Sequence, residues 1–207
     1  MSSTLAETIV AIRAGSPVIV PTDTVYGLAC TPHEAEPVRL LSRLKGRDEG
    51  QPIALVVADL DLLLSCLPEI RGRSALLART VLPGPYTLVL PNPAGRFPWL
   101  AGESADTIGV RVPALEDGPA RTLLQRAGAL AATSANLHGG ADPRRLEDVD
   151  PELRAGVAAA LDGGQLPGRP STVIDCSRGE PVVLREGVAA GADAVARLRA
   201  ALAGRRQ

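Results

Sequence analysis

Apolar residues recur along this chain at two spacings, which predict alternating strands and helices. Short runs of apolar and β-branched residues predict strands at 18–20, 53–57, 86–90, 107–113, 129–133, 171–175 and 182–184. Apolar positions three or four residues apart predict helices at 5–13, 34–45, 60–66, 73–81, 118–127, 151–161 and 192–203. Thr4 and Glu7 form a capping-box pattern at the first helix, and Asp59 precedes the third. Strands that alternate with helices through short connections predict a single α/β domain over residues 1–207.

The segment 21–28, which reads Pro-Thr-Asp-Thr-Val-Tyr-Gly-Leu, follows the first predicted strand and begins with polar residues. Open α/β sheets bind ligands at the ends of their strands, where small polar groups are useful. Thr22 and Asp23 are also residue types that cap the next turn with a side-chain oxygen. Spacing alone favours the capping interpretation, so other segments are needed to choose between the two.

Composition limits the classes of function. The 207 residues carry a net charge of −1 and only 2% aromatic residues, so the core is aliphatic and no overall charge favours a nucleic-acid partner. Cys30, Cys66 and Cys176 are far apart and no export signal precedes them, which predicts free thiols in a reducing cytoplasm. With His33 and His138 as the histidines, a His/Cys metal site is not expected. No apolar run approaches the roughly 20 residues of a membrane helix.

Three basic residues stand out from the others. Lys45 is the one lysine among 22 basic residues, and it is predicted to lie with Arg47 in a loop after the second helix. An ammonium is a compact point charge that suits an anion, but cations at a helix C-terminus are also common for electrostatic reasons alone. Arg111 lies inside an apolar strand and must be paired if it points inward. Its partner is then either a structural carboxylate such as Asp23 or the carboxylate of a ligand.

Polar residues gather where several predicted strands end. They are Thr22, Thr24, Ser134, Asn136, Ser171, Thr172 and Arg185. Convergence of strand ends on one cleft is the usual arrangement of a ligand site in an α/β fold. Ser134 and Asn136 are equally compatible with a turn before Gly139, and the glycines at 163–168 are compatible either with a phosphate nest or with a plain loop. Neither a Gly-x-x-x-x-Gly-Lys-Ser/Thr loop nor a Gly-x-Gly-x-x-Gly motif is present.

Taken in order, six motifs of this chain resemble one known family. They are Pro-Thr-Asp-Thr-Val-Tyr-Gly-Leu at 21–28, Lys-Gly-Arg at 45–47, Pro-Gly-Pro-x-Thr at 83–87, Arg-Val-Pro at 111–113, Ser-Ala-Asn-Leu at 134–137 and Ser-Thr-Val-Ile-Asp at 171–175. The chain resembles the YrdC/Sua5 family of L-threonylcarbamoyladenylate synthases, in its short, single-domain form, over residues 5–187. The resemblance implies a YrdC-like (DHBP synthase-like) α/β fold, in which helices flank a twisted mixed sheet with a concave ligand cleft.

The resemblance also implies an amino-acid pocket. In it, Thr22 contacts L-threonine, with Thr24 as the alternative in the same loop. Arg111 binds the threonine carboxylate, a bidentate task that suits a guanidinium. Ser171 and the backbone at Ala132 complete the pocket.

A nucleotide site is implied beside this pocket. The matched residues are Lys45, Arg47, Ser134 and Asn136 around the ATP phosphates, as catalytic residues, and Thr107 and Arg185 on the ATP side. Mg²⁺ is expected on the ATP phosphates rather than on a protein cluster. Three positions depart from the family pattern: Val56, His138 and Asp142, of which Asp142 replaces a hydroxyl and would repel phosphate if it faced the ligand.

The implied activity is that of a cytoplasmic tRNA-modification enzyme. L-threonine, bicarbonate or CO2, and ATP give threonylcarbamoyl-AMP and pyrophosphate, and a separate tRNA threonylcarbamoyl transferase complex uses the product. Weak binding of tRNA or double-stranded RNA is compatible with the resemblance. One alternative is a paralogue that binds nucleotide or double-stranded RNA without making the adenylate. Another is a carbamoyl-transfer relative such as the YrdC-like module of hydrogenase maturation proteins, which usually accompanies zinc-type cysteine motifs that this sequence lacks.

Overall fold

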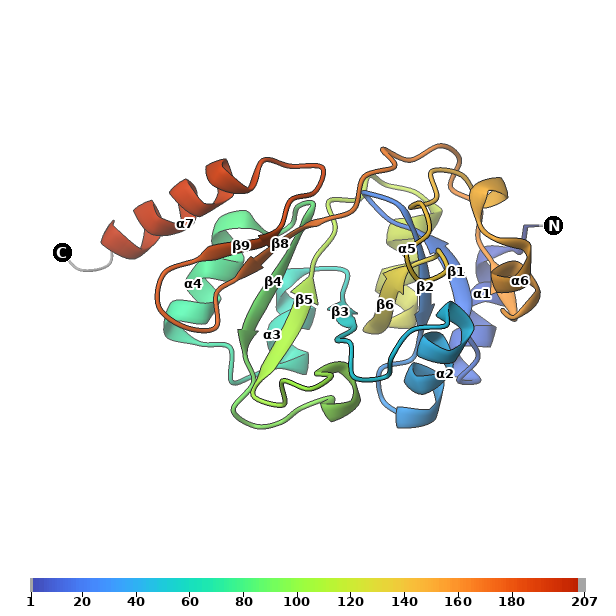
Figure 1. The fold of residues 1–207 in the computed structure, drawn as a ribbon, viewed down its shortest axis with the longest axis horizontal. Helices are drawn as coiled ribbons and strands as arrows, with labels where there is room; N and C mark the ends of the chain where they lie inside the picture. Colours follow the sequence, from blue (N-terminus) through green and yellow to red (C-terminus); the bar gives the residue numbers. More distant parts are fainter. Residues whose placement is uncertain (1, 205–207) are drawn as a thin grey trace.

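The computed structural model describes residues 2–204, and within them nine strands form one mixed sheet (Figure 1). The strands are β1 (Val18–Pro21), β2 (Tyr26–Cys30), β3 (Ala54–Val56), β4 (Tyr86–Pro91), β5 (Thr107–Arg111), β6 (Leu130–Ser134), β7 (Ala159–Ala160), β8 (Thr172–Asp175) and β9 (Val182–Arg185). Their order across the sheet is β7-β1-β2-β6-β3-β5-β4-β8-β9. The pairs β1–β7, β3–β5 and β4–β8 are parallel and the other neighbours antiparallel. This arrangement confirms the predicted fold class.

Helices flank the sheet, and most of them lie where the apolar spacing predicts. They are α1 (Leu5–Arg13), α2 (Ala35–Lys45), α3 (Leu60–Cys66), α4 (Gly72–Val81), α5 (Pro119–Ala127), α6 (Pro151–Ala155) and α7 (Gly191–Gly204), with short 3₁₀ turns η1 (Pro98–Leu100) and η2 (Leu146–Asp148). The predicted capping box of α1 is present: the Glu7 N–H donates to Thr4 Oγ1 at 3.2 Å, and the Thr4 N–H donates to Glu7 Oε2 at 2.7 Å. Asp59 caps α3 through the Leu62 N–H.

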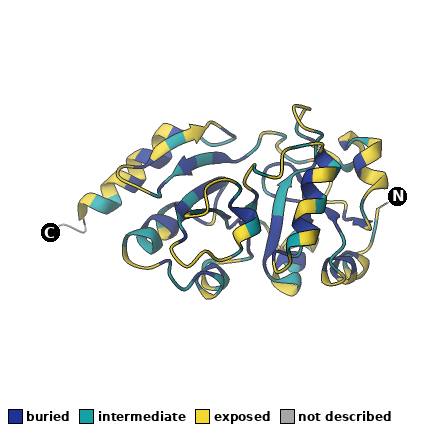
Figure 2. Ribbon diagram, turned by 60° about the horizontal axis from the view of Figure 1, so that its bottom comes forward, coloured by how far each residue is buried: buried dark blue, intermediate teal, exposed yellow. Residues whose placement is uncertain are grey.

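The two faces of the sheet are covered differently. One face carries the larger core, where α2, α3, α4 and α7 contribute Leu41, Leu63, Leu77 and Leu198. On the opposite face, α1 and α5 pack a second core against the half of the sheet built from β1, β2 and β6. The same face of β4, β5 and β8 borders a cavity instead. Figure 2 shows the buried central strands between helices whose outer sides are exposed.

Strand alternation decides which side chains reach that cavity. In β5, Ile108 and Val110 are buried in the larger core, whereas Thr107, Gly109 and Arg111 line the cavity. Successive side chains of a strand point to opposite faces of the sheet. The apolar half of the pattern therefore anchors the strand, and the other half builds the site.

Strand β2 was not predicted, because residues 21–28 were interpreted as a loop. In the structure a short turn at 22–25 reverses the chain, and β2 pairs antiparallel with β1, so that Val20 lies opposite Gly27. All five residues of β2 are buried. Such a strand lacks the polar–apolar alternation by which half-exposed strands are recognised.

The predicted helix at 151–161 is wrong in its second half. Helix α6 ends at Ala155, and residues 159–160 form β7, parallel to β1. The Ala158 N–H donates to Pro17 O at 2.9 Å, and the Leu161 N–H donates to Ile19 O at 2.9 Å. A Cβ at Gly156 would lie 2.5 Å from Leu44 Cδ2, so this position is closely packed. Sheet pairing and packing here override the high helix propensity of the alanine run.

Candidate functional site

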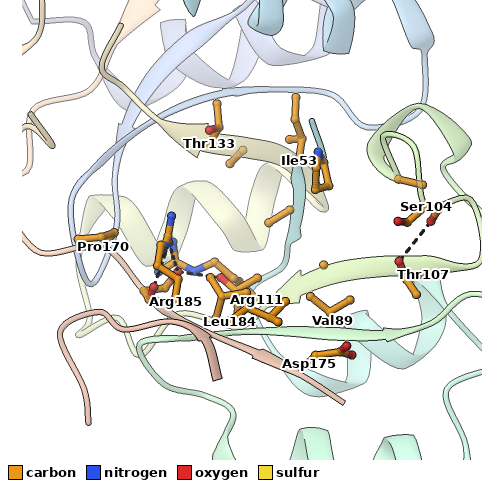
Figure 3. Close-up of a pocket in the computed structure, with 18 of the residues that line it drawn as sticks. Ile53, Val89, Ser104, Thr107, Arg111, Thr133, Pro170, Asp175, Leu184 and Arg185 are labelled. Carbon is orange, nitrogen blue, oxygen red and sulfur yellow. Dashed lines mark hydrogen bonds between the residues drawn. The ribbon is translucent and has the colours of Figure 1, made fainter. Parts of the chain in front are cut away.

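The cavity has a volume of about 650 Å³ and lies over the uncovered half of the sheet (Figure 3). Its floor is made by the outward-facing residues of β4, β5 and β8, and the segments 101–107 and 170–171 form parts of its wall. Most of the predicted site residues line it, namely Thr22, Arg47, Thr107, Arg111, Ala132, Ser134, Ser171 and Arg185. The fold therefore brings together side chains that are more than 160 positions apart in the sequence.

Three predicted residues, Thr24, Lys45 and Asn136, lie behind this lining rather than in it. Thr24 Oγ1 is 3.0 Å from Thr22 Oγ1. The hydroxyl of Ser134 donates to Asn136 Oδ1 at 2.5 Å, and the same oxygen accepts from Lys45 Nζ at 3.0 Å. Each of the three is thus one hydrogen bond away from a residue of the cavity wall.

Arg111 is paired with Asp23. Its Nη2 donates to Asp23 Oδ1 at 2.7 Å and to Thr24 Oγ1 at 3.1 Å, and the side chains of Arg111 and Asp23 are 11% and 6% exposed. The other oxygen, Asp23 Oδ2, accepts from the Ala114 N–H at 3.1 Å. Burial raises the pKa of Asp23, and the Arg111 charge and the Ala114 N–H oppose that rise. Of the two partners left open for Arg111, the structure shows the structural carboxylate.

The Arg111 side chain keeps donors that Asp23 does not use. Its Nε is buried and has no hydrogen-bond partner among the described residues, and the same is true of Arg47 Nε. A buried N–H without a partner is costly, and most such groups in proteins are satisfied by protein, water or a ligand. Both arginines line the cavity, so each is suited to an anionic ligand there.

The two threonines of the opening segment have different positions. Thr22 Oγ1 donates to Val25 O at 2.7 Å and accepts from the Thr24 and Val25 N–H groups, so it does cap the turn as spacing alone favours. Thr22 also lines the cavity, whereas Thr24 is fully buried. The two interpretations of Thr22 are therefore compatible, because one side chain closes the turn and borders the cavity.

Lys45 is the last residue of α2 rather than part of the following loop, because Gly46 ends the helix at φ 61°. The lysine residue is 5% exposed, and its Nζ donates to Ser134 O and to Asn136 Oδ1. Among residues 2–204, no carboxylate forms an ion pair with Lys45 within 4.0 Å. Burial, aided by the charge of Arg47, lowers the pKa of Lys45 to about 8, and the charge of Asp142 opposes this.

Arg47 and Arg185 both line the cavity and are held by neutral oxygens. Arg47 donates to Gln51 O at 2.7 Å and to Thr133 Oγ1 at 3.3 Å. Arg185 donates to Ser171 O at 2.9 Å. Neutral acceptors orient these guanidinium groups without cancelling their charge, which leaves both available to an anion.

Sequence reasoning missed Thr87 as a cavity residue. Its hydroxyl is 2.8 Å from Ser171 Oγ, and both residues line the cavity. The signal was available, because Thr87 alternates with apolar neighbours in a strand that packs its other face in the core. Asp175, at the end of β8, was missed likewise: it lines the cavity and accepts from the Ser177 N–H at 2.8 Å.

The glycine loop at 163–168 is used for structure. Its Gly163 N–H donates to Tyr26 Oη at 2.9 Å, and its Gly164 N–H donates to Asp162 Oδ1 at 2.9 Å. Burial raises the pKa of Tyr26 to about 12, so its hydroxyl stays protonated. Of the two interpretations of this loop, the plain loop is the one that these contacts favour.

The described residues 2–204 hold no group of three or more His, Cys, Asp or Glu side chains that could bind a metal ion. Within the same residues, no helix is long and apolar enough to cross a membrane. The three cysteines are free, as predicted, and Cys30 and Cys176 are buried.

Residues 10–187 match the family model of Sua5, YciO and YrdC proteins, which is described as "Telomere recombination". The chain belongs to this family. The match covers most of the chain and confirms the resemblance drawn from the six motifs, and it places the cavity residues from Thr22 to Arg185 inside the family domain.

Two curated relatives carry the name threonylcarbamoyl-AMP synthase. The threonylcarbamoyl-AMP synthase of Pyrococcus abyssi is 35% identical over 177 residues, which are 85% of this chain and 52% of the relative. That of Stenotrophomonas maltophilia is 38% identical over 167 residues, or 77% of this chain and 86% of the relative. The chain thus spans about half the length of the first relative and most of the second.

Solved structures agree with the fold. Sua5 from P. abyssi, in a crystal structure complexed with L-threonine, matches with a TM-score of 0.80 and 34% identity over 88% of this chain and 54% of that one. YciO from E. coli matches with a TM-score of 0.80 and 27% identity over 92% and 98% of the two chains.

Proposed function

We propose that this protein is a threonylcarbamoyl-AMP synthase acting in tRNA modification. The observation that carries the proposal is the cavity itself. A buried arginine suited to a carboxylate borders it, and so does Arg47, which together with Lys45 behind the wall forms a basic cluster suited to phosphates. The names of the curated relatives supply the reaction that requires such a pair of sites.

The amino-acid end of the cavity would be the part around Arg111. Arg111 would bind the carboxylate of L-threonine, with Thr22, Ser171 and the backbone at Ala132 around the rest of the molecule. The P. abyssi relative was crystallised with L-threonine, which supports this substrate. A guanidinium with a free Nε–H is well matched to a carboxylate, because its planar fork donates two parallel hydrogen bonds.

The nucleotide end would be the cluster of Lys45, Arg47, Ser134 and Asn136. Together with Thr107 it would orient ATP so that its α-phosphate faces the amino acid. Arg185, which the resemblance implies on the ATP side, lies next to Arg111 and would belong to the amino-acid end (Figure 3). Because no group of metal-ligating side chains stands among residues 2–204, no step is assigned to a protein-held metal. Mg²⁺ would enter on the ATP phosphates, where it neutralises part of their charge.

Two bonds form in the proposed reaction. The threonine amine, after loss of a proton, attacks the carbon of CO2, or of bicarbonate with release of water, and gives a carbamate. A carbamate oxygen then attacks the α-phosphorus of ATP, and pyrophosphate leaves. Charge builds up on phosphate oxygens, so the protein contributes by positioning and by its fixed cations more than by a dedicated base.

Release of pyrophosphate from ATP tests the proposal. We expect release that requires both L-threonine and bicarbonate, with mass spectrometry detecting threonylcarbamoyl-AMP. Release that is indifferent to threonine and bicarbonate would refute the synthase. ATP binding without any turnover would favour the non-synthase paralogue instead. In the cell, the product would pass to a threonylcarbamoyl transferase complex in the cytoplasm, and affinity for tRNA with a steep salt dependence would show direct RNA binding.

A further inference from the structure

Two arginines share the amino-acid end of the cavity. Arg111 and Arg185 both line it and lie next to each other in Figure 3. They are close enough that the charge of Arg185 contributes to lowering the pKa of Arg111, although burial is the larger cause. Arg185 is held by the carbonyl oxygen of Ser171, which does not offset its charge.

Asp23 stands behind this pair and outside the cavity wall. One of its oxygens accepts from Arg111 at 2.7 Å and the other from the Ala114 N–H at 3.1 Å. Both oxygens are therefore engaged, and the side chain is only 6% exposed. Asp23 is placed to act on a ligand through Arg111, rather than by touching the ligand.

The local charge follows from these three groups. Two guanidinium groups and one carboxylate leave a net charge of +1 at this end of the cavity. The remaining charged groups of the wall are Arg47, Asp106, Asp175 and Arg178, of which Asp106 and Arg178 form an ion pair with each other. One excess positive charge matches one carboxylate. A phosphate carries roughly 1.5 to 2 negative charges near neutral pH and would remain under-compensated there.

We propose that Asp23 is a specificity-determining residue, which reduces the charge of the Arg111–Arg185 subsite so that it selects a carboxylate over a phosphate. This inference rests on the proposed function, because it takes L-threonine as the carboxylate. It explains how one cavity keeps an amino acid and a polyphosphate in separate places. Among residues 2–204, neither Lys45 nor Arg47 forms an ion pair with a carboxylate, so their cluster stays attractive to phosphate. Asp23 makes the Arg111 end less attractive to phosphate.

The test is a competition between two probes, L-threonine and inorganic phosphate. Calorimetry at constant ionic strength measures the binding of threonine with and without phosphate. For the unchanged protein, we expect the inhibition constant of phosphate against threonine to exceed the threonine Kd at least tenfold. Asp23→Asn should lower the ratio of the phosphate constant to the threonine Kd at least tenfold. Asp23→Glu, which keeps the charge, should leave the ratio within about threefold of the original value.

Asp117→Asn is the matched control. Asp117 also pairs with an arginine, Arg121, at 2.8 Å, but its side chain is 95% exposed. The substitution removes the same charge from an exposed side chain that is not part of the cavity wall, so we expect the ratio to stay unchanged. A purely structural role of Asp23 would weaken both ligands together and leave the ratio unchanged in Asp23→Asn, which would overturn the inference.

The outcomes separate the inference from the function on which it rests. If the unchanged protein binds threonine but Asp23→Asn keeps its ratio, the inference fails and the synthase stands. If the unchanged protein does not bind threonine, both fail. If Asp23→Asn does not fold, the competition measured on the unchanged protein tests the inference. Phosphate that displaces threonine at a phosphate concentration similar to the threonine Kd would overturn it.

Discussion

Arg111 and Lys45 are both nearly buried cations beside one cavity, but their surroundings differ. Arg111 has a carboxylate partner, Asp23, at 2.7 Å, and a hydroxyl at 3.1 Å. Lys45 has only neutral oxygens, from Ser134 and Asn136. The first arrangement fixes an orientation and keeps a permanent charge. The second holds a charge that burial makes easy to lose, since the pKa of Lys45 is lowered to about 8.

The difference indicates two tasks for the two cations. A guanidinium locked by a buried ion pair suits a small zwitterion that must be held in one geometry. An ammonium without a counter-ion is electrostatically unsatisfied until an anion arrives, which suits a polyphosphate. Substitutions of Arg111 and Lys45 examine this contrast.

The largest expected effect is on turnover. Arg111→Ala and Lys45→Ala should each lower threonine-dependent pyrophosphate release at least about 100-fold, since the first removes the cation that positions threonine and the second removes a cation that offsets charge on the phosphates. Calorimetry should separate them, with threonine binding lost in the first and ATP binding lost in the second. A variant that melts near the wild-type temperature and keeps its activity would remove that residue from the site.

A smaller effect should distinguish the two variants in stability. Arg111→Ala leaves the Asp23 carboxylate buried and unpaired, and breaking a buried pair in this way typically costs about 3–5 kcal/mol. Lys45→Ala leaves only neutral oxygens, so we expect a free energy of unfolding within about 1–2 kcal/mol of the wild type. Urea denaturation measures both. The double variant Asp23→Ala with Arg111→Ala should recover part of the first loss, and equal losses in the two single variants would contradict the contrast.

The most gradual expected effect, at most about 1.4 kcal/mol for each pH unit, is a pH dependence of stability that belongs to Lys45. In the folded protein its pKa is about 8, against an ordinary value of 10.5. Between these values the unfolded chain holds a proton that the folded protein has released, so stability should rise with pH across this window, by roughly 3 kcal/mol. Below pH 8 both states are protonated and the contribution is flat.

Lys45→Met is the control for this rise, because it keeps the length of the side chain and cannot titrate. Denaturant unfolding from pH 7 to 10.5 should show a shallower rise in the variant than in the wild type. Parallel curves would mean that Lys45 is not the group responsible.

Much of the fold could be predicted because its signals are local. The Thr4–Glu7 box begins α1 where expected, and the apolar spacing of 34–45 predicts α2. The failures came where pairing overrides local preference. Residues 26–30 lack a polar–apolar alternation because they are buried throughout, and alanines 159 and 160 become a strand because β1 offers them a partner.

The sequence could predict which residues lie at the site, but not which residues they pair with. Motif resemblance pointed to Thr22, Arg111 and Ser171, all of which line the cavity, although their roles stay predictions. The sequence left open whether Arg111 pairs with Asp23 or with a ligand carboxylate. Asp23 and Arg111 lie 88 positions apart, and only the fold brings them together. The burial of Lys45 was likewise invisible, because helix periodicity does not show that β6 and the turn after it enclose the end of α2.

A crystal structure of the protein with L-threonine and a non-hydrolysable ATP analogue would show where each ligand binds. We expect the threonine carboxylate on Arg111 with the Asp23 pair intact, and the phosphates at Lys45, Arg47, Ser134 and Asn136. Phosphate oxygens on Arg111, or threonine bound away from it, would contradict the division of the cavity into a carboxylate end and a phosphate end.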